Sequence, residues 1–327
     1  ELEARIFKAD DNHLKHSSFK EHLQGIQLRW SNNAHELSYE LSHNHIDPDR
    51  LASRQVRQQA GHNLKSALRH VYMLDGRDDA FSPTSGAGLQ LVTEFAGIGP
   101  DPKLQRYFKH EASVVGCIPL PYGCVLQMNA TGGIILPWHT EPNGHDNNLP
   151  WSSSASPADP SQERTTSINE RFFLGGPINL RGFRTRGVGP TDARRPAKQG
   201  EGSSGEASSS NKAPTKVARD ALGGDFKLAA SASFNFPFPN KLLDAVGARG
   251  HVFADVGTIL PMSQPFTGAR DVAKSAMNTM RMTTGIGLGW ATQIGRVEIN
   301  YCHIVRSQEF DRIKRGIQIG LIPFSFR

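Results

Sequence analysis

A strict alternation of apolar and polar side chains in the second half of the chain constrains its fold more than any other feature. Four consecutive segments show it, and they span residues 225–238, 249–257, 280–290 and 296–302. In the first segment every second residue from Phe226 to Phe236 is apolar, with polar residues such as Lys227 between them. In the second segment Phe253 is the one exception. Successive side chains of a β-strand point to opposite faces, so the pattern predicts four strands.

The composition of the two faces separates two architectures that both alternate. A soluble sandwich buries its apolar face and gives the polar face to water. Here the apolar face is made of large side chains, with aromatic residues near the segment ends: Phe236, Phe238, Trp290 and Tyr301. Membrane interfaces favour aromatic residues at such positions. The opposite face mixes arginine, acids and glycine, which favours a transmembrane barrel with a wet interior; a soluble sandwich is the alternative.

The first half of the chain repeats the alternation less regularly. Its expected strands span residues 1–8, 19–30, 35–45, 63–72, 86–97, 104–118 and 122–135. A last strand over 315–327 brings the expected total to about twelve. Short turns alternate with longer connections, which include 258–278 and 307–314. Outer-membrane barrels connect their strands in this way, so the predicted fold is all-β, a transmembrane antiparallel β-barrel.

The composition speaks against several other classes of protein. No apolar run approaches the eighteen or so residues that a membrane helix needs. The net charge of +6 suits an anionic partner or a lumen lined with arginine. Three cysteines without a CxxC pair predict neither a zinc site nor a disulfide framework. His43 and His45 share a strand face without a third ligand, so we expect no metal site.

A region with almost no strand signal separates the two halves of the chain. It lies between Pro137 and Gly223 and is far longer than an ordinary loop. Two parts of it, residues 151–163 and 193–216, are of low complexity, and we expect both to be disordered. We expect 193–216 to be a spacer whose deletion is tolerated. Between these parts stands ERFFLGGPINLRGFRTRGVGP, residues 170–190, which is too specific for a spacer.

Four motifs follow one another in the second half: FLGGPINLRGF at 173–183, LGGD at 222–225, FADVG at 253–257 and RVEINYC at 296–302. The chain then ends on GIQIGLIPFSFR. Together they resemble the BamA-like superfamily of outer-membrane assembly barrels. The first motif closely resembles the loop-six signature of that family, and the others resemble parts of its last five strands. ERFFLGGP with EINYC is most similar to the mitochondrial branch, the core barrel subunits of the sorting and assembly machinery.

The resemblance implies an organisation in three parts. Barrels of that family have sixteen strands, so residues 1–137 would be equivalent to strands five to eleven and 223–327 to the last five strands. Residues 138–222 would be loop six, with the RGF motif and the low-complexity insert. The first four strands and the POTRA domain of the family would then be missing from this sequence.

The resemblance also implies a site inside the lumen. In the family the arginine of the RGF motif pairs with an aspartate of the thirteenth strand, and these residues are Arg181 and Asp255 here. Strand parity agrees independently, because Asp255 falls on the polar face with Arg249 and His251. An ion pair of this kind would offset the entropy lost in ordering a long loop. The implied motif residues of the loop are Leu174, Gly175, Gly176, Arg181, Gly182 and Phe183.

The last strand is the second implied site. In the family its pairing with the first strand is weak and opens sideways, so that a substrate strand can add to its edge. The implied residues of this gate are Gly316, Ile317, Gln318, Ile319, Gly320 and Leu321. Residues 314–321 also fit the pattern of mitochondrial barrel sorting signals, a polar residue, then glycine, then two alternating hydrophobic residues.

The function implied by the resemblance is insertion of β-barrel precursor proteins into the mitochondrial outer membrane. The implied partners are unfolded precursors, other subunits of the sorting and assembly machinery and outer-membrane lipids, and no nucleic acid. No nucleophile–base pair or phosphate-binding loop stands in a suitable context, so we expect neither an enzyme nor a cofactor. The alternatives are a chloroplast-envelope translocation channel, a bacterial assembly barrel and a passive β-barrel pore.

Overall fold

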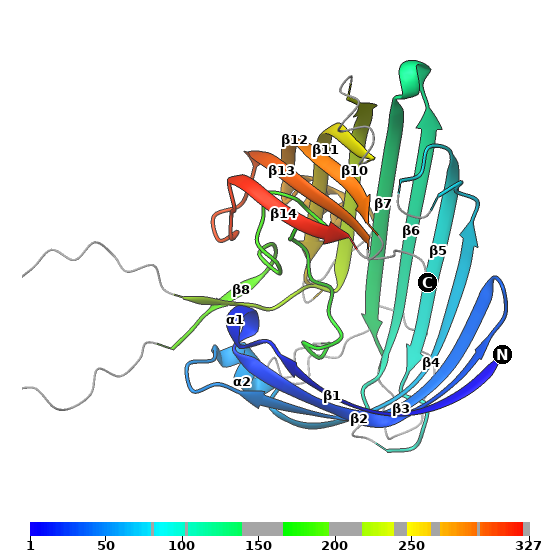
Figure 1. Cartoon of the computed structure of the whole chain (residues 1–327). Coiled ribbons are helices and arrows are strands. Elements are labelled where there is room, and N and C mark those ends of the chain that lie inside the picture. The colour runs from blue at the N-terminus through cyan, green and yellow to red at the C-terminus, as the bar shows by residue number, and fades with distance from the viewer. Residues whose placement is uncertain are drawn as a thin grey trace, which may run out of the picture.

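Twelve strands form one sheet, in which each strand pairs antiparallel with the next one along the chain (Figure 1). The computed structural model describes residues 1–79, 82–101, 104–138, 166–195, 218–238, 247–262, 269–292 and 295–322. The strands are β1 (Leu2–Asn12), β2 (Phe19–Ser31), β3 (His35–Pro48), β4 (Gly61–Asp75), β5 (Gly86–Ala96), β6 (Tyr107–Pro119), β7 (Val125–Pro137), β10 (Phe226–Pro237), β11 (Ala248–Leu260), β12 (Arg281–Thr292), β13 (Gly295–Arg306) and β14 (Gly316–Ile322).

The predicted all-β, barrel-like fold class is confirmed. Each expected strand is present; seven of the twelve are longer than expected, and residues 323–327 of the last one lie outside the described residues. The sheet curves around the segment 166–195, as Figure 1 shows. Over the described residues it does not close into a ring, because β1 pairs with β2 alone and β14 with β13 alone. Where the chain is described, it contains no helix long and apolar enough to cross a membrane.

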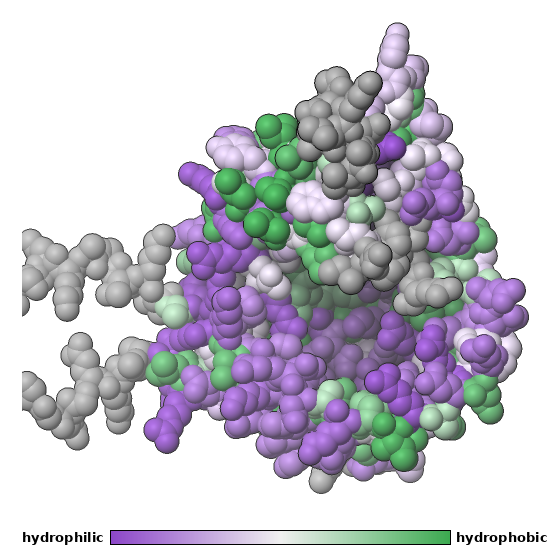
Figure 2. All heavy atoms as spheres, viewed as in Figure 1, coloured by the Kyte–Doolittle hydropathy of each residue, from purple (hydrophilic) through white to green (hydrophobic). Residues whose placement is uncertain are grey.

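The register of the strands produces one polar and one apolar face. Asp255 of β11 pairs with Ser231 of β10 and Thr283 of β12, and all three lie on the inner face. Three residues earlier on β11, Val252 pairs with Phe234 and Ile286, and these side chains are 40–60% exposed on the outer face. Figure 2 shows such hydrophobic side chains, in green, gathered in the region of β12–β14. An outward apolar face of this kind suits contact with lipid.

The core lies inside the curved sheet. Its largest cluster joins wall residues with residues of the segment 166–195, and its members are Ala67, Ala96, Tyr107, Ile135, Phe172, Leu174, Leu180, Phe183, Val188, Ala229 and Ile259. About half of the cluster therefore comes from a segment with almost no strand signal. Burial of these side chains against the wall stabilises the segment by the hydrophobic effect.

Small elements occupy the connections at both ends of the strands. At the end with the long connections lie α1 (Leu14–Ser17), α2 (Arg54–Gln58), α4 (Ala269–Asn278) and a two-stranded hairpin of β8 (Thr191–Ala193) and β9 (Arg219–Ala221). A single turn, η1 (Pro121–Gly123), joins β6 to β7 at the other end. Helices as short as α1 and α2 are not stable in isolation, so tertiary contacts must hold them.

Candidate functional site

The segment 166–195, which we call the lumen loop, folds back on itself inside the sheet. Leu174 pairs with Val188 and Gly176 with Leu180 through isolated backbone bridges. Gly175 and Gly176 have φ angles of 109° and 113°, which L-residues rarely adopt. Leu174 and Phe183 are both buried against the wall. The loop is therefore a compact plug whose turns depend on glycine.

Gly182 lets the lumen loop lie flush on the wall. Its φ angle is 83°, and a Cβ atom added there would lie 2.6 Å from Cγ2 of Thr283 and 3.4 Å from Cβ of Cys302. A side chain at position 182 would push the loop off β12 and β13. Because Gly182 lies this close to the wall, the side chain of the neighbouring Arg181 comes within reach of Asp255.

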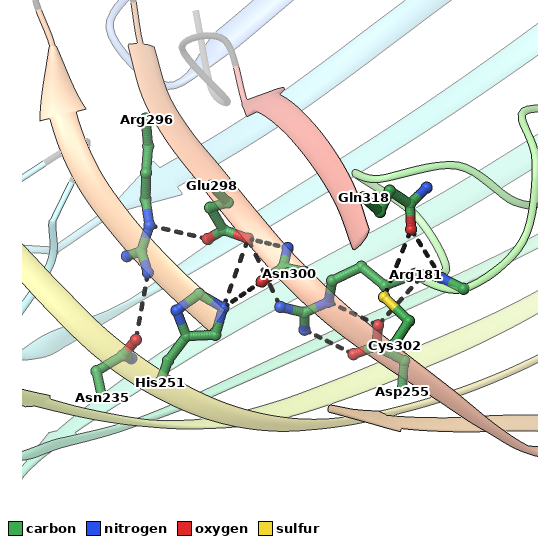
Figure 3. Close-up of polar contacts among 10 residues, drawn as sticks. Arg181, Asn235, His251, Asp255, Arg296, Glu298, Asn300, Cys302 and Gln318 are labelled. Carbon is green, nitrogen blue, oxygen red and sulfur yellow. Dashed lines mark hydrogen bonds and ion pairs between the residues drawn. The ribbon is translucent and has the colours of Figure 1, made fainter. Parts of the chain in front are cut away.

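Arg181 and Asp255 form a two-pronged ion pair at the centre of the site (Figure 3). Nε and Nη2 of Arg181 donate to Oδ2 and Oδ1 of Asp255, each over 2.7 Å, and the backbone N–H of Arg181 donates to Oδ2 over 3.2 Å. Asp255 is 2% exposed. The guanidinium carbon also lies 3.7 Å from the ring centroid of Phe253. Phe253, the one exception to the alternation of its strand, thus points inward, and its ring lies beneath the guanidinium of Arg181.

A wider polar network continues from this pair across the inner wall. Nη1 of Arg181 lies 3.6 Å from Oε2 of Glu298, and Nε of Arg296 lies 2.9 Å from Oε1 of the same carboxylate. Asn300 donates to Glu298 over 3.1 Å, and Nε2 of His251 lies 2.7 Å from Oδ1 of Asn300. With Asp255 the network balances two arginines against two carboxylates, which a buried site requires.

The charge of Arg181 is held firmly by its surroundings. Burial alone would lower the pKa of its guanidinium, but the hydrogen bonds and charge of Asp255 hold that pKa above its ordinary value. Arg181 is therefore cationic throughout the physiological pH range. A planar fork with parallel donors fits a carboxylate in a way that lysine cannot reproduce.

A second set of buried charges holds the start of the lumen loop, and sequence reasoning missed it. Nζ of Lys65 on β4 lies 3.2 Å from Oε1 of Glu170 and 2.9 Å from Oε1 of Glu94 on β5. Tyr107 donates to Glu94 over 2.5 Å, and Lys109 donates to the backbone oxygen of Glu170 over 2.9 Å. The lumen loop is thus fixed to both halves of the sheet, at Glu170 and at Arg181.

The hairpin of β8 and β9 is fixed to α1 and α2 by one buried acid, Asp220. Its carboxylate accepts from Oγ of Ser18 over 2.6 Å, from the backbone N–H of Ser53 over 2.9 Å and from Nε of Arg194 over 2.7 Å. Asp220 is fully buried. This contact was also not predicted, because Asp220 carries no motif and lies beside low-complexity sequence.

The structure corrects one boundary of the expected spacer 193–216. Residues 193–195 belong to the hairpin and its docking contacts, because Arg194 pairs with Asp220 and the backbone N–H of Arg195 donates to the oxygen of Leu51. Residues 151–163 and 196–216 of the two low-complexity parts lie outside the described residues.

The predicted gate residues lie on β14, at the edge of the sheet. Ile317, Ile319 and Leu321 point outward and are at least 45% exposed, whereas Gln318 is 2% exposed. Oε1 of Gln318 accepts from the backbone N–H of Gly182, and Nε2 donates to the backbone oxygen of Phe183. Gly316 begins the strand, and Gly320 faces the lumen loop. The structure thus brings both predicted sites together at one place.

The predicted histidine pair faces outward at the end of β3 that lies near α1 and α2. His43 and His45 contact His62 of β4, with Nε2 of His43 lying 3.1 Å from Nδ1 of His62. Across the described residues no group of three or more histidine, cysteine or acidic side chains is arranged to hold a metal ion.

Comparison with known proteins places these features in a family. A family model described as the Omp85 superfamily domain matches residues 8–321. A SAM50-like protein of Schizosaccharomyces pombe is 27% identical over 300 residues, which cover 92% of this chain and 50% of that protein. The sorting and assembly machinery component 50 homolog of Homo sapiens is 27% identical over 278 residues, or 83% of this chain and 48% of that protein. The chain spans about half the length of these curated relatives.

A solved structure shares the fold. BamA from Haemophilus ducreyi lacking POTRA domains 1–3 superposes with a TM-score of 0.65 over 97% of this chain and 57% of that chain. Its sequence identity is 16%, so the likeness concerns the fold of the strands.

Proposed function

The chain belongs to the Omp85 superfamily, and we propose that it inserts and assembles β-barrel precursor proteins in the mitochondrial outer membrane. The observation that carries the proposal is the ion pair of Arg181 with Asp255, which fixes the lumen loop beside the edge strand β14. The names of the curated relatives, which refer to a sorting and assembly machinery, support the same reading.

The organisation of the chain follows from the same proposal. Residues 1–137 correspond to strands five to eleven of the family barrel, 138–222 to loop six, and 223–327 to the last five strands. The partners are unfolded barrel precursors, other subunits of the machinery and outer-membrane lipids. The polar edge of a strand supplies backbone donors and acceptors to an incoming strand, and lipid penalises leaving them unpaired. Assembly of this kind needs no covalent chemistry and no cofactor.

A filled interior favours assembly over passive diffusion. The lumen loop packs Leu174, Leu180 and Phe183 against the inner wall, and these side chains are at most 1% exposed. A wide passive pore would instead keep its interior open to water. This geometry therefore favours a role in the assembly of precursors over that of a passive pore.

The proposal can be tested in mitochondria depleted of their own copy of the protein. Restoring the chain in its full-length context should restore conversion of a radiolabelled barrel precursor to its folded, protease-resistant form. A fluorescent fusion should mark the mitochondrial outer membrane. Large steady conductance without any effect on precursor assembly would support the passive pore, and fluorescence at plastids would support the chloroplast-envelope relative.

Deleting residues 196–217 should leave assembly close to that of the unchanged protein. The backbone N–H of Arg194 donates to the oxygen of Ala218 over 2.9 Å, so a short glycine–serine linker can join the two sides of the hairpin. Deleting 193–216 instead removes Arg194 and should release the hairpin. Precursor assembly measured for both deletions tests this contrast, and complete loss of assembly in the shorter deletion would show that the insert has a function of its own.

Replacing Asp220 by alanine should detach the hairpin from α1 and α2. The substitution leaves Ser18, Ser53 and Arg194 without their shared acceptor, at a cost of about 2–4 kcal/mol. Deuterium exchange of the Ser53 amide should accelerate strongly. Asp192→Ala is the matched control, because its carboxylate accepts only one longer bond from α2, over 3.3 Å from the backbone of Gln55. Equal exchange at Ser53 in both variants would contradict the role of Asp220.

A further inference from the structure

Gln318 is the one buried polar side chain on the described part of β14, and both ends of its amide contact the lumen loop. Oε1 accepts from the backbone N–H of Gly182 over 2.8 Å, and Nε2 donates to the oxygen of Phe183 over 3.3 Å. Sγ of Cys302 on β13 lies 3.7 Å from the same Oε1. A buried amide with both ends satisfied by backbone fixes the position of its strand relative to the loop.

The chain leading into β14 also pairs with the lumen loop through its backbone. Lys314 N–H donates to the oxygen of Gly182 over 2.8 Å, and Arg184 N–H donates to the oxygen of Arg312 over 2.9 Å. Arg312 N–H in turn donates to the oxygen of Gly187 over 2.8 Å. Residues 182–187 thus form a short ladder with residues 312–314, immediately before β14 begins.

The far part of β14 touches the loop as well. A Cβ atom added at Gly320 would lie 2.7 Å from Cβ of Pro177, so the ring of Pro177 packs directly on the backbone of the strand. On its other side β14 pairs over its described length with β13 alone. An edge strand held by only one neighbour is easily displaced unless something else holds it.

We propose that Gln318 is a positioning residue that fastens the edge strand β14 to the lumen loop, so that strand and loop move as one body. The two amide hydrogen bonds and the 312–314 ladder supply the second support that β14 lacks from a neighbouring strand. Displacing β14 therefore requires breaking contacts with residues 182–187. These are the residues next to Arg181, which is itself fixed to Asp255.

The meaning of this coupling rests on the proposed function. If precursor strands add at the β14 edge, then the lumen loop holds that edge in one register. When the edge moves, the loop loses its contacts with β14. The chain of contacts runs from Asp255 through Arg181 and Gly182 to Gln318, without a gap in the described structure. Gln318 thereby links the charge network of the inner wall to the edge at which a precursor would pair.

Gln318→Met tests the proposal, because methionine keeps the size of the side chain and removes both hydrogen bonds. Deuterium exchange of the full-length protein in membranes, read by mass spectrometry, should rise about tenfold at Gly182. Exchange at Lys314 and along β14 should rise with it. Val305→Met, an outward substitution on β13, is the matched control and should leave all three regions unchanged.

Gln318→Glu separates the two hydrogen bonds. A carboxylate keeps the acceptor for Gly182 N–H and loses the donor to Phe183, so Gly182 should stay protected while the rest of the ladder loosens. Faster exchange at Gly182 without any change in β14, or no change in Gln318→Met at all, would overturn the proposal. Because no precursor takes part in the measurement, its outcome is independent of whether the protein assembles barrels.

Discussion

Arg181→Ala is expected to release the lumen loop and to abolish most precursor assembly. The substitution leaves Asp255, 2% exposed, without its cation and removes one of the two arginines that balance Glu298. Removing one partner of a buried pair costs about 3–5 kcal/mol, far more than a surface ion pair contributes. Trypsin should then cleave the loop at Arg184 and Arg186 in the membrane-bound protein, and the yield of folded radiolabelled precursor should fall at least tenfold.

Two matched variants make this prediction sharper. Arg184→Ala removes an exposed arginine of the same loop and should assemble precursors normally. Arg181→Met combined with Asp255→Leu removes both charges of the pair, so that neither a lone guanidinium nor a lone carboxylate is left. Precursor assembly should therefore fall less in this double variant than in Arg181→Ala. Normal precursor insertion together with unchanged trypsin sensitivity in Arg181→Ala would contradict the role given to the pair.

Lys65→Met is expected to have the second largest effect. Lys65 is the cation between Glu94 and Glu170, and all three side chains are at most 13% exposed. Without it one cation, Lys109, is left beside two buried carboxylates, and the uncompensated charge again costs about 3–5 kcal/mol. The stem of the lumen loop at Glu170 should detach from β4 and β5, and protease should reach it at a lower urea concentration than in the unchanged protein.

A second substitution distinguishes charge from packing at Lys65. Adding Glu170→Gln to Lys65→Met removes one of the two facing carboxylates and should recover part of the lost protection. Lys20→Met, at an exposed position of β2, is the control for losing a lysine. If Lys65→Met resists protease as well as that control, then Lys65 does not hold the loop.

The strands could be predicted from the sequence because the outer face of the sheet is mostly apolar and the inner face is mostly polar. Period-two alternation located β10 to β13 and, less regularly, the strands of the first half, and parity alone put Asp255 on the inner face. The exception at Phe253 is now explained by the cation–π contact of its ring with Arg181, 3.7 Å above it. A break in an otherwise regular strand was therefore a signal of the site that the sequence reasoning did not use.

The contacts between distant segments could not be read in this way. Lys65 and Glu170 meet although 105 positions separate them, and Lys65 lies in a strand whose alternation is weak. Asp220 organises α1, α2 and the hairpin, yet nothing in its neighbourhood distinguishes it from the low-complexity sequence before it. Both are tertiary contacts whose partners are set by how the sheet curves, and alternation along one strand does not determine that curvature.

A cross-link between positions 181 and 255 tests the central claim most directly. Cysteines placed at both positions remove the two charges of the pair together, as in the double variant, and the buried side chains of Leu174, Leu180 and Phe183 keep the loop on the inner wall. In a background without Cys117, Cys124 and Cys302 they are treated in membranes with a short bifunctional thiol reagent. A protease site built into 196–217 then separates the chain between the two positions. The account predicts that the two fragments stay joined on a denaturing gel, and that they separate when the second cysteine is placed at the outward position 254. Fragments that separate with cysteines at 181 and 255 would contradict it.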